Sequence, residues 1–224
     1  MDIEKLYDHI LCIYKKYNIS TFPINCLELA KKCGYKIIKY SELTETKRSA
    51  CLSLSKDACI VKKILHYEDR NKSERIRFSI AHELGHVFLN SELEEDADNF
   101  ASHFLAPRIM IHKYRCETSD QIHEIFGLSY DASNRALMDY RKWYENIAQT
   151  THKPSEPERQ LESLISLEKK DNTLIDYEEV EEEEIYKPTF EEKYAYIQRA
   201  LKAGLPIPPE YASAYRMYRK MGLK

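Results

Sequence analysis

The residues best suited to chemistry in this chain form one short cluster, His82-Glu83-Leu84-Gly85-His86. Two histidines four residues apart lie about 40° from each other on one face of an α-helix, so both imidazoles can reach a single metal ion. Glu83 flanks that face, next to the ion but not on it, where a carboxylate can take a proton from water. The spacing therefore predicts an H-E-x-x-H metal site with His82 and His86 as ligands and Glu83 as general base.

A zinc ion is the expected occupant, and a catalytic zinc site has three protein ligands and an open fourth position. Four acidic residues follow between positions 94 and 98, on a second predicted helix that Ser91 can cap. On a helical wheel, Glu94 and Asp96 border the buried face of this helix, and Glu94 is the closer. We therefore predict Glu94 as the third ligand, Asp96 as the alternative and Glu95 as a solvated charge. Glu94 could instead be the fourth residue of a capping box that begins at Ser91.

The helix that carries the motif is predicted from a capping signal at Asn71 to Leu89. It is apolar over most of its circumference, and its single polar stripe contains both histidines. Buried polar groups need partners, and a metal ion would satisfy them. The plainer alternative is a pair of hydrogen-bonded core histidines beside a surface glutamate.

Residues 77–89 and 94–107 resemble, in order, the two motifs of the ImmA/IrrE family of metallopeptidases, R-F-x-x-A-H-E-L-G-H-x-x-L-H and E-x-x-A-x-x-F-A-x-x-L-L-x-P. The resemblance covers about residues 20 to 145. In the family, the first Glu of the second motif is the third zinc ligand, and it falls on Glu94. Asn90, Asp96 and the segment 104–106 depart from the pattern, but none of these departures removes a ligand or the base.

The resemblance implies a zinc-dependent endopeptidase that cleaves a helix-turn-helix repressor of a mobile element or a stress response. The alternative is a non-proteolytic regulatory module with structural zinc, which would sequester a repressor or an antitoxin-like partner. The group that stabilises the oxyanion is left open between His103, expected at the surface, and His66 or Tyr67. A strand over residues 58–65 could pair with an extended substrate, or it could be an ordinary internal strand.

The apolar spacing predicts an α+β fold, in which a small antiparallel or mixed sheet packs on a zinc-binding helix pair and a helical tail region follows. Helices are expected over residues 2–17 and 25–32, and strands over 35–40, 50–54 and 58–65. Residues 118–143 resemble the helical tail of the same family and also a helix-turn-helix. Because this segment is nearly neutral, we expect it to pack or bind a partner, and direct nucleic-acid binding is not expected.

Charge is distributed unevenly along the 224 residues, which are 43% hydrophobic and 32% charged. Residues 1–150 hold equal numbers of acidic and basic side chains and are predicted to form the metallopeptidase domain. Residues 151–188 are strongly acidic and read as a solvated linker, and 189–224 are predicted to form a basic, tyrosine-rich helical hairpin. The hairpin could dock on the domain, bind a partner or fold against the acidic segment.

Membrane spans and secretion are not expected, because no apolar run approaches the roughly 18 residues of a transmembrane helix and the first residues are charged. The six cysteines form no C-x-x-C pair, which favours reduced, mostly buried thiols. We therefore expect a cytoplasmic protein that does not bind membranes.

Overall fold

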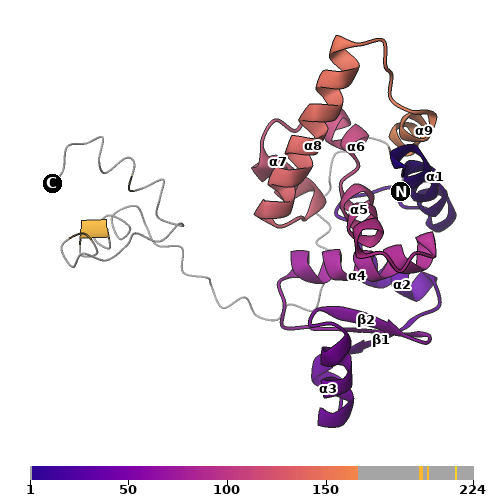
Figure 1. Ribbon diagram of the computed structural model, residues 1–224, viewed down its shortest axis with the longest axis vertical. Coiled ribbons are helices and arrows are strands. Elements are labelled where there is room, and N and C mark those ends of the chain that lie inside the picture. Colours follow the sequence, from indigo (N-terminus) through magenta and orange to yellow (C-terminus); the bar gives the residue numbers. More distant parts are fainter. Residues whose placement is uncertain (1, 166–196, 199–200, 202–214, 216–224) are drawn as a thin grey trace. The chain divides into compact units, whose positions relative to one another are not determined.

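The structure is a computed structural model that describes residues 2–165 and, further along the chain, residues 197, 198, 201 and 215. Residues 2–165 have the mixed α+β fold that the sequence predicts (Figure 1). In chain order the elements are α1 (Ile3–Tyr17), α2 (Cys26–Lys32), β1 (Lys36–Lys39), the 3-10 helix η1 (Tyr40–Glu42), α3 (Glu45–Leu54), β2 (Ala58–Val61), β3 (Ile64–Tyr67), α4 (Ser73–Leu89), α5 (Glu94–Leu105), α6 (Arg108–Lys113), α7 (Ser119–Phe126), α8 (Tyr130–Gln149) and α9 (Glu156–Leu164).

The three strands form a mixed sheet in the order β1-β3-β2. β1 runs parallel to β3, whereas β2 and β3 form an antiparallel hairpin that pairs Ile60 with Leu65. The sheet lies against α4 (Figure 1), and β2 is the strand that contacts this helix most. The edge strand β2 therefore runs beside the helix that carries the two histidines.

Helices α4 and α5 pack closely on each other at the centre of the fold. Ile80 and Leu84 on α4 and Phe100 and Phe104 on α5 have no exposed surface, and the two phenylalanine rings stack with centroids 5.1 Å apart. Burying side chains of this size contributes about 2 kcal/mol each. The buried faces thus fix the two helices relative to each other, and their polar faces point into one shared region.

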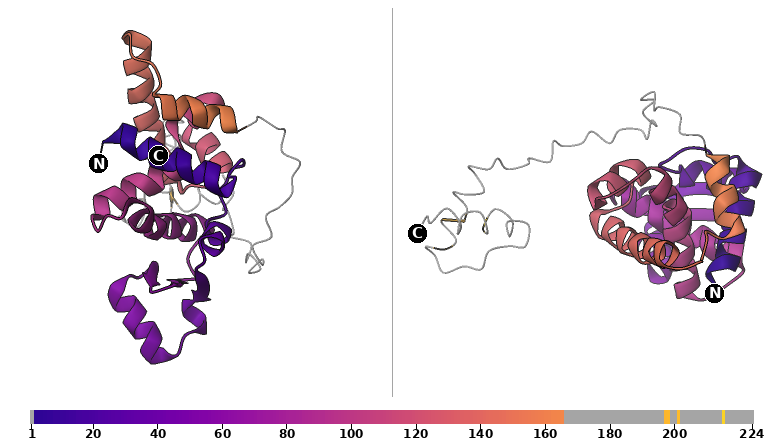
Figure 2. Two further views of the ribbon diagram at one scale, coloured as in Figure 1. Left: turned by 90° about the vertical axis from the view of Figure 1, so that its right-hand side faces the viewer. Right: turned by 90° about the horizontal axis from the view of Figure 1, so that it is seen from above.

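Helix α9 extends the packed unit beyond its predicted end. Residues 151–188 were expected to form a linker, yet the part from Glu156 to Leu164 is a helix that packs on α1 and α6, with Leu161 fully buried. Figure 2 shows α9 beside α1. A capping box between Ser155 and Glu158 starts this helix. The linker was predicted from the excess of acidic residues, and this count took no account of the capping box or of the buried apolar residues.

Two of the predicted strands differ from the structure. Residues 50–54 lie in α3, where Cys51 is the only buried residue, so their short apolar run reflects a surface helix. Residues 58–65 form two strands joined at Lys62 and Lys63. Lys62 has a φ of 58°, a conformation usually taken by Gly or Asn, so the residue type gave no sign of a turn.

The predicted helical tail region is present as α7 and α8, which are joined through Gly127 in the left-handed conformation. The remaining linker, 166–188, lies outside the described residues. The predicted hairpin 189–224 does too, apart from positions 197, 198, 201 and 215, and it stays a prediction.

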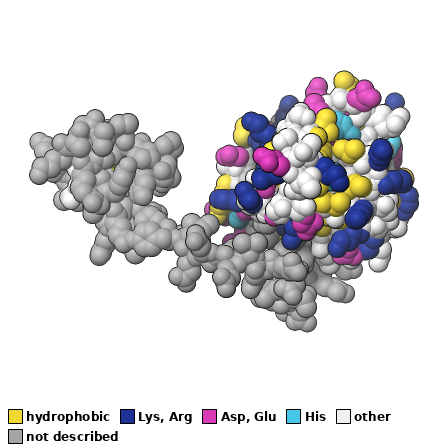
Figure 3. Space-filling view, turned by 90° about the horizontal axis from the view of Figure 1, so that it is seen from below, with side chains coloured by type: hydrophobic (Ala, Val, Ile, Leu, Met, Phe, Trp, Pro, Cys, Tyr) yellow, Lys and Arg dark blue, Asp and Glu magenta, His cyan; other side chains and the backbone are white. Residues whose placement is uncertain are grey.

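No helix in the described part of the chain combines the length and the apolarity needed to cross a membrane. Figure 3 shows a face on which basic and acidic side chains are interspersed with hydrophobic ones.

Candidate metal centre and cleft

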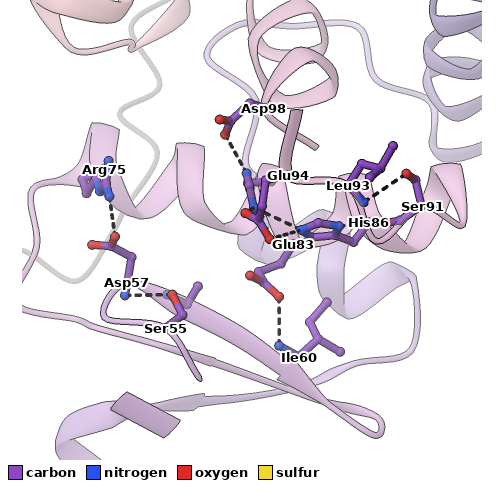
Figure 4. A network of polar contacts seen from close by, with 12 residues as sticks. Ser55, Asp57, Ile60, Arg75, Glu83, His86, Ser91, Leu93, Glu94 and Asp98 are labelled. Atoms are coloured by element: carbon purple, nitrogen blue, oxygen red, sulfur yellow. Dashed lines mark hydrogen bonds and ion pairs between the residues drawn. The ribbon is translucent and has the colours of Figure 1, made fainter. Parts of the chain in front are cut away.

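Three side chains converge where α4 meets the start of α5. Figure 4 labels two of them, His86 and Glu94. His82 and His86 lie one turn apart on α4, and Glu94 is the first residue of α5. The two Nε2 atoms are 3.2 Å apart, and the Glu94 carboxylate lies 3.2 Å from His82 Nε2 and 3.6 Å from His86 Nε2. The fold thus brings the three predicted ligands together as a group that could hold a metal ion.

Both imidazoles are oriented by hydrogen bonds at Nδ1. His86 Nδ1 lies 2.8 Å from the Ser91 carbonyl oxygen, which can only accept, so this nitrogen carries the ring proton. His82 Nδ1 lies 2.8 Å from the Asp98 carboxylate, which is also an acceptor. In the neutral rings, both Nε2 lone pairs therefore face each other and Glu94. These three converging groups all carry lone pairs, which repel one another unless a cation lies among them. The two imidazoles and the carboxylate therefore fit a metal ion.

The size of the group also suits a small tetrahedral ion. Ligand atoms about 2.0–2.1 Å from a tetrahedral zinc ion lie roughly 3.3–3.4 Å from one another. The 3.2 Å between the two Nε2 atoms and the 3.2 Å from His82 Nε2 to Glu94 Oε2 are close to this spacing, and the other carboxylate oxygen, Oε1, lies 3.6 Å from His86 Nε2. The side chain of Glu94 is 80% exposed, so the group opens to solvent and is not enclosed by protein.

Glu83 lies beside this group and points toward the sheet (Figure 4). Its Oε2 atom accepts a 3.1 Å hydrogen bond from the backbone N–H of Ile60 on β2. Burial raises the pKa of the Glu83 carboxyl, while the Ile60 N–H and the two imidazoles act in the opposite direction. The edge strand therefore positions a half-buried carboxylate next to the metal group, which is the cluster of His82, His86 and Glu94.

Comparison with known families agrees with this arrangement. Residues 36–138 match the family model Peptidase_M78, described as the IrrE N-terminal-like domain. This segment is an IrrE N-terminal-like domain of the ImmA/IrrE family. No curated protein and no solved structure matched the chain. The resemblance found from the sequence motifs is thus confirmed, and the family is one of metal-dependent peptidases.

The match runs from β1 into α8, so the IrrE N-terminal-like domain contains the whole sheet and both helices of the metal group. Asn90, which departs from the family motif, ends α4 with a φ of 47°. Asn is one of the few residue types that favour this left-handed cap, which gives the departure a local structural reason.

A cleft of about 630 Å³ adjoins the metal group of the IrrE N-terminal-like domain. At one end, Asp57 accepts a hydrogen bond from Arg75 on α4 (Figure 4). From there the cleft passes the metal group and continues between α5 and α8. Its lining in that second part consists mainly of small or polar side chains: Asn99, Ser102, His103, Ala106, Ala132, Arg135, Ala136 and Asp139.

The other predicted candidates lie away from the metal group. Asp96, the alternative ligand, is buried and accepts a 2.6 Å hydrogen bond from the Ser91 hydroxyl, whereas Glu95 is exposed as predicted. His66 and Tyr67 are buried on the central strand, and neither lines the cleft. None of them is placed to stabilise an oxyanion at the metal group.

His103 differs from its prediction as a surface histidine. Its ring is half-buried against Tyr7 of α1 and lines the cleft. A wheel of α5 alone could not show this contact, because Tyr7 lies 96 residues away in the sequence.

Sequence reasoning also missed the groups that orient the site. Asp98 follows Glu94 by four residues and so shares its helix face, a spacing that could have identified it as a partner for His82. The Ser91 carbonyl and the Ile60 N–H are backbone groups, for which residue type gives no signal.

Proposed function

We propose that this protein is a zinc-dependent endopeptidase whose substrate is a helix-turn-helix repressor of a mobile element or a stress response. The observation that carries the proposal is the position of Glu83, which lies beside three converging metal-ligand atoms in a cleft open to solvent. Structural zinc sites are closed by four protein ligands, whereas the described part of the chain supplies three ligands to this group, which opens to solvent. The repressor class rests on the family resemblance.

His82, His86 and Glu94 would hold the ion. Two imidazoles and one carboxylate suit zinc better than Mg²⁺ or Ca²⁺, which prefer oxygen ligands. When bound, zinc polarises the scissile carbonyl and lowers the pKa of a water molecule toward about 7.

Glu83 acts as the general base. Its Oε2 accepts the Ile60 N–H, so Oε1 is the oxygen available to take the proton of the attacking water. The same carboxyl then returns this proton to the leaving amine. The backbone of β2 holds Glu83 in place between these two steps.

The edge strand β2 is suited to bind the substrate main chain. Val61 and Ile64 are the hydrogen-bonded pair that closes the hairpin. Because such pairs alternate with non-hydrogen-bonded ones along an antiparallel ladder, the backbone groups of Ile60, which precedes Val61, point away from β3. Ala58, two residues earlier, points the same way and lines the cleft. The Ile60 N–H is held by Glu83 and the Ala58 N–H by Ser55 Oγ, so the carbonyl oxygens of Ala58 and Ile60 are the backbone groups that an extended peptide would use at this edge. Such a peptide would lie along α4 and pass the metal group.

The test compares full-length wild type with Glu83→Gln, and uses Glu95→Gln as the matched exposed control. Purified protein is loaded with zinc and incubated with a purified helix-turn-helix repressor from the same organism, with and without a chelator. We expect Glu83→Gln to bind zinc like the wild type but to cleave about 10²- to 10⁴-fold more slowly. Cleavage by Glu83→Gln at the wild-type rate would refute the assigned role.

The same assay separates the endopeptidase from a regulatory binding module. A module with structural zinc would co-elute with the repressor and leave it intact. Cleavage that stops with chelator supports the endopeptidase, and a stable complex without cleavage supports the module.

A further inference from the structure

His103 lines the part of the cleft that lies beyond the metal group. It follows Glu94 by nine residues on the same helix, a distance of roughly 13 Å along the axis. Its ring contacts Tyr7 edge-on, with centroids 5.5 Å apart. His103 is therefore too far from the metal group to take part in the chemistry, but it lines the same cleft as His82 and Glu94.

The hydrogen bonds around Tyr7 fix the proton on His103. The Tyr7 hydroxyl oxygen accepts the backbone N–H of Arg108 at 3.2 Å, and it lies 3.2 Å from His103 Nδ1. Burial raises the pKa of the Tyr7 phenol far above its usual range, so the hydroxyl keeps its proton. A buried donor left without an acceptor costs about 1–3 kcal/mol, so the hydroxyl donates to His103 Nδ1.

A neutral imidazole carries one N–H group, and Nδ1 is the acceptor here. The single proton of His103 must therefore be on Nε2. Burial also lowers the pKa of His103, which favours the neutral ring, and the nearby charges of Asp139, Glu158 and Arg108 partly offset one another. Because His103 lines the cleft and its Nδ1 is occupied by Tyr7, the Nε2–H group is the donor that this ring can offer to a ligand there.

The opposite wall leaves room for a peptide backbone. Ala132 and Ala136 lie one turn apart on α8 and line the same part of the cleft. An extended chain advances about 3.3 Å per residue, so a peptide cleaved at the metal group would pass His103 about four residues from the scissile bond. At this point a main-chain carbonyl oxygen is the acceptor that every peptide offers.

We infer that His103 is a substrate-binding residue, whose Nε2–H donates to a main-chain carbonyl oxygen about four residues from the scissile bond and whose orientation is set by Tyr7. The inference rests on the proposed peptidase function. A role in substrate binding explains why His103, which lies away from the metal group, is held by the Tyr7 hydroxyl of α1.

The first test measures the tautomer and needs no activity. Imidazole ¹⁵N spectra are recorded on the full-length, zinc-loaded Glu83→Gln protein, and His103→Gln assigns the resonance. We expect Nδ1 to be unprotonated and Nε2 protonated at neutral pH, and Tyr7→Phe to weaken this preference. A proton on Nδ1 in the Tyr7-containing protein would overturn the inference.

The second test measures binding with acetylated, amidated peptides of alternating Ala and Ser, either four or ten residues long. Because Glu83→Gln removes the base, binding is measured apart from cleavage. We expect the ten-residue peptide to shift the His103 Nε2 resonance, and His103→Leu to weaken its binding about three- to tenfold. His103→Gln keeps a side-chain N–H and should recover part of the affinity, whereas the four-residue peptide should not distinguish the variants.

Equal affinity of the ten-residue peptide for His103→Leu and the parent protein would overturn the inference, as would the absence of a His103 shift. An equal loss for both peptides would also do so, because it would indicate a general structural role. Failure of the proposed peptidase function has a different signature, since the wild type would then cleave no repressor while the binding result would stand.

Discussion

Gly85 on α4 lies directly against Phe100 on α5. A Cβ atom at Gly85 would come within 2.9 Å of Phe100 Cδ1 and within 3.3 Å of the Ala97 Cα atom. No real Cβ makes the first of these contacts without a shift of its neighbour. The absence of a side chain at Gly85 therefore lets the backbone of α5 approach α4 closely, and this approach brings Glu94 to the two imidazoles.

Gly85→Ala should separate the two helices. Overpacking a core costs about 1–3 kcal/mol, while replacing a helical Gly by Ala gains about 1 kcal/mol. We expect a net loss in the free energy of unfolding and weaker zinc binding, measured by urea unfolding and by competition with a chromophoric chelator. Adding Phe100→Leu should recover part of the zinc affinity by removing the clash. Unchanged zinc affinity in Gly85→Ala would show that helix spacing does not control the site.

Asp98→Ala should weaken zinc binding without removing a ligand. The Asp98 carboxylate accepts the His82 Nδ1–H at 2.8 Å and so holds the ring with Nε2 toward Glu94. Loss of such a partner typically lowers metal affinity about 10- to 100-fold. Competition with a chelator measures the effect, and Glu95→Ala, an exposed acid of the same helix, is the control. Equal affinities for the two variants would contradict the role assigned to Asp98.

The convergence of His82, His86 and Glu94 could be predicted from sequence because it depends on helical periodicity. His82 and His86 are separated by one turn, and Glu94 follows from the apolar face of the next helix, so local geometry placed all three. The partners of these groups come from elsewhere. The Ile60 N–H belongs to a strand 23 residues before Glu83, and residue type does not report where a backbone amide points.

The same reasoning explains the errors in the fold. Helices with a strong amphipathic pattern, such as α1 and α5, were predicted close to their observed positions. The segment 50–54 carries too few buried residues to show a period, and the turn at Lys62 uses a residue type that rarely adopts its φ. Helix α9 was not predicted from the sequence because charged residues dominate its composition, although its Leu161 side chain is fully buried.

Asp57→Asn should make stability depend less on pH. Asp57 accepts hydrogen bonds from Arg75 and from Asn71, the latter at 2.9 Å, and so ties the start of α4 to the start of β2. The hydrogen bond from Arg75 is the main cause that holds the pKa of the Asp57 carboxyl below its usual range. A carboxyl with a lowered pKa stabilises the fold above its unfolded-state pKa of about 3.9, and this contribution is lost as the pH falls through the folded-state value.

We therefore expect Asp57→Asn to be less stable than the wild type by about 1 kcal/mol at pH 7. The difference should shrink as the pH falls below about 4. Urea unfolding in the presence of a chelator measures this without a contribution from metal binding. Asp8→Asn, an exposed change on α1, should leave the difference near zero throughout. A constant difference between Asp57→Asn and wild type over this pH range would rule out the ionic contribution.

Glu158 and Arg108 form an ion pair that attaches α9 to the domain. Glu158 is 1% exposed, and its Oε1 accepts the Arg108 Nε–H at 2.7 Å. Its Oε2 accepts from the Ser155 backbone N–H at 2.8 Å, so the same carboxylate also caps α9. The Arg108 guanidinium lies over the rings of Tyr7 and Trp143. Glu158 is the carboxylate that pairs with its positive charge.

Glu158→Ala should detach α9, because it leaves a largely buried guanidinium without its carboxylate and removes the helix cap. Breaking a buried ion pair by removing one partner costs about 3–5 kcal/mol. We expect a lower melting temperature and faster proteolysis between residues 150 and 165. Glu156→Ala, an exposed change in the same turn, should have little effect. Replacing both partners by Arg108→Met and Glu158→Leu should recover much of the stability, since no charge is then left buried. If Glu158→Ala behaved like Glu156→Ala, α9 would be held by Leu161 and its apolar neighbours alone.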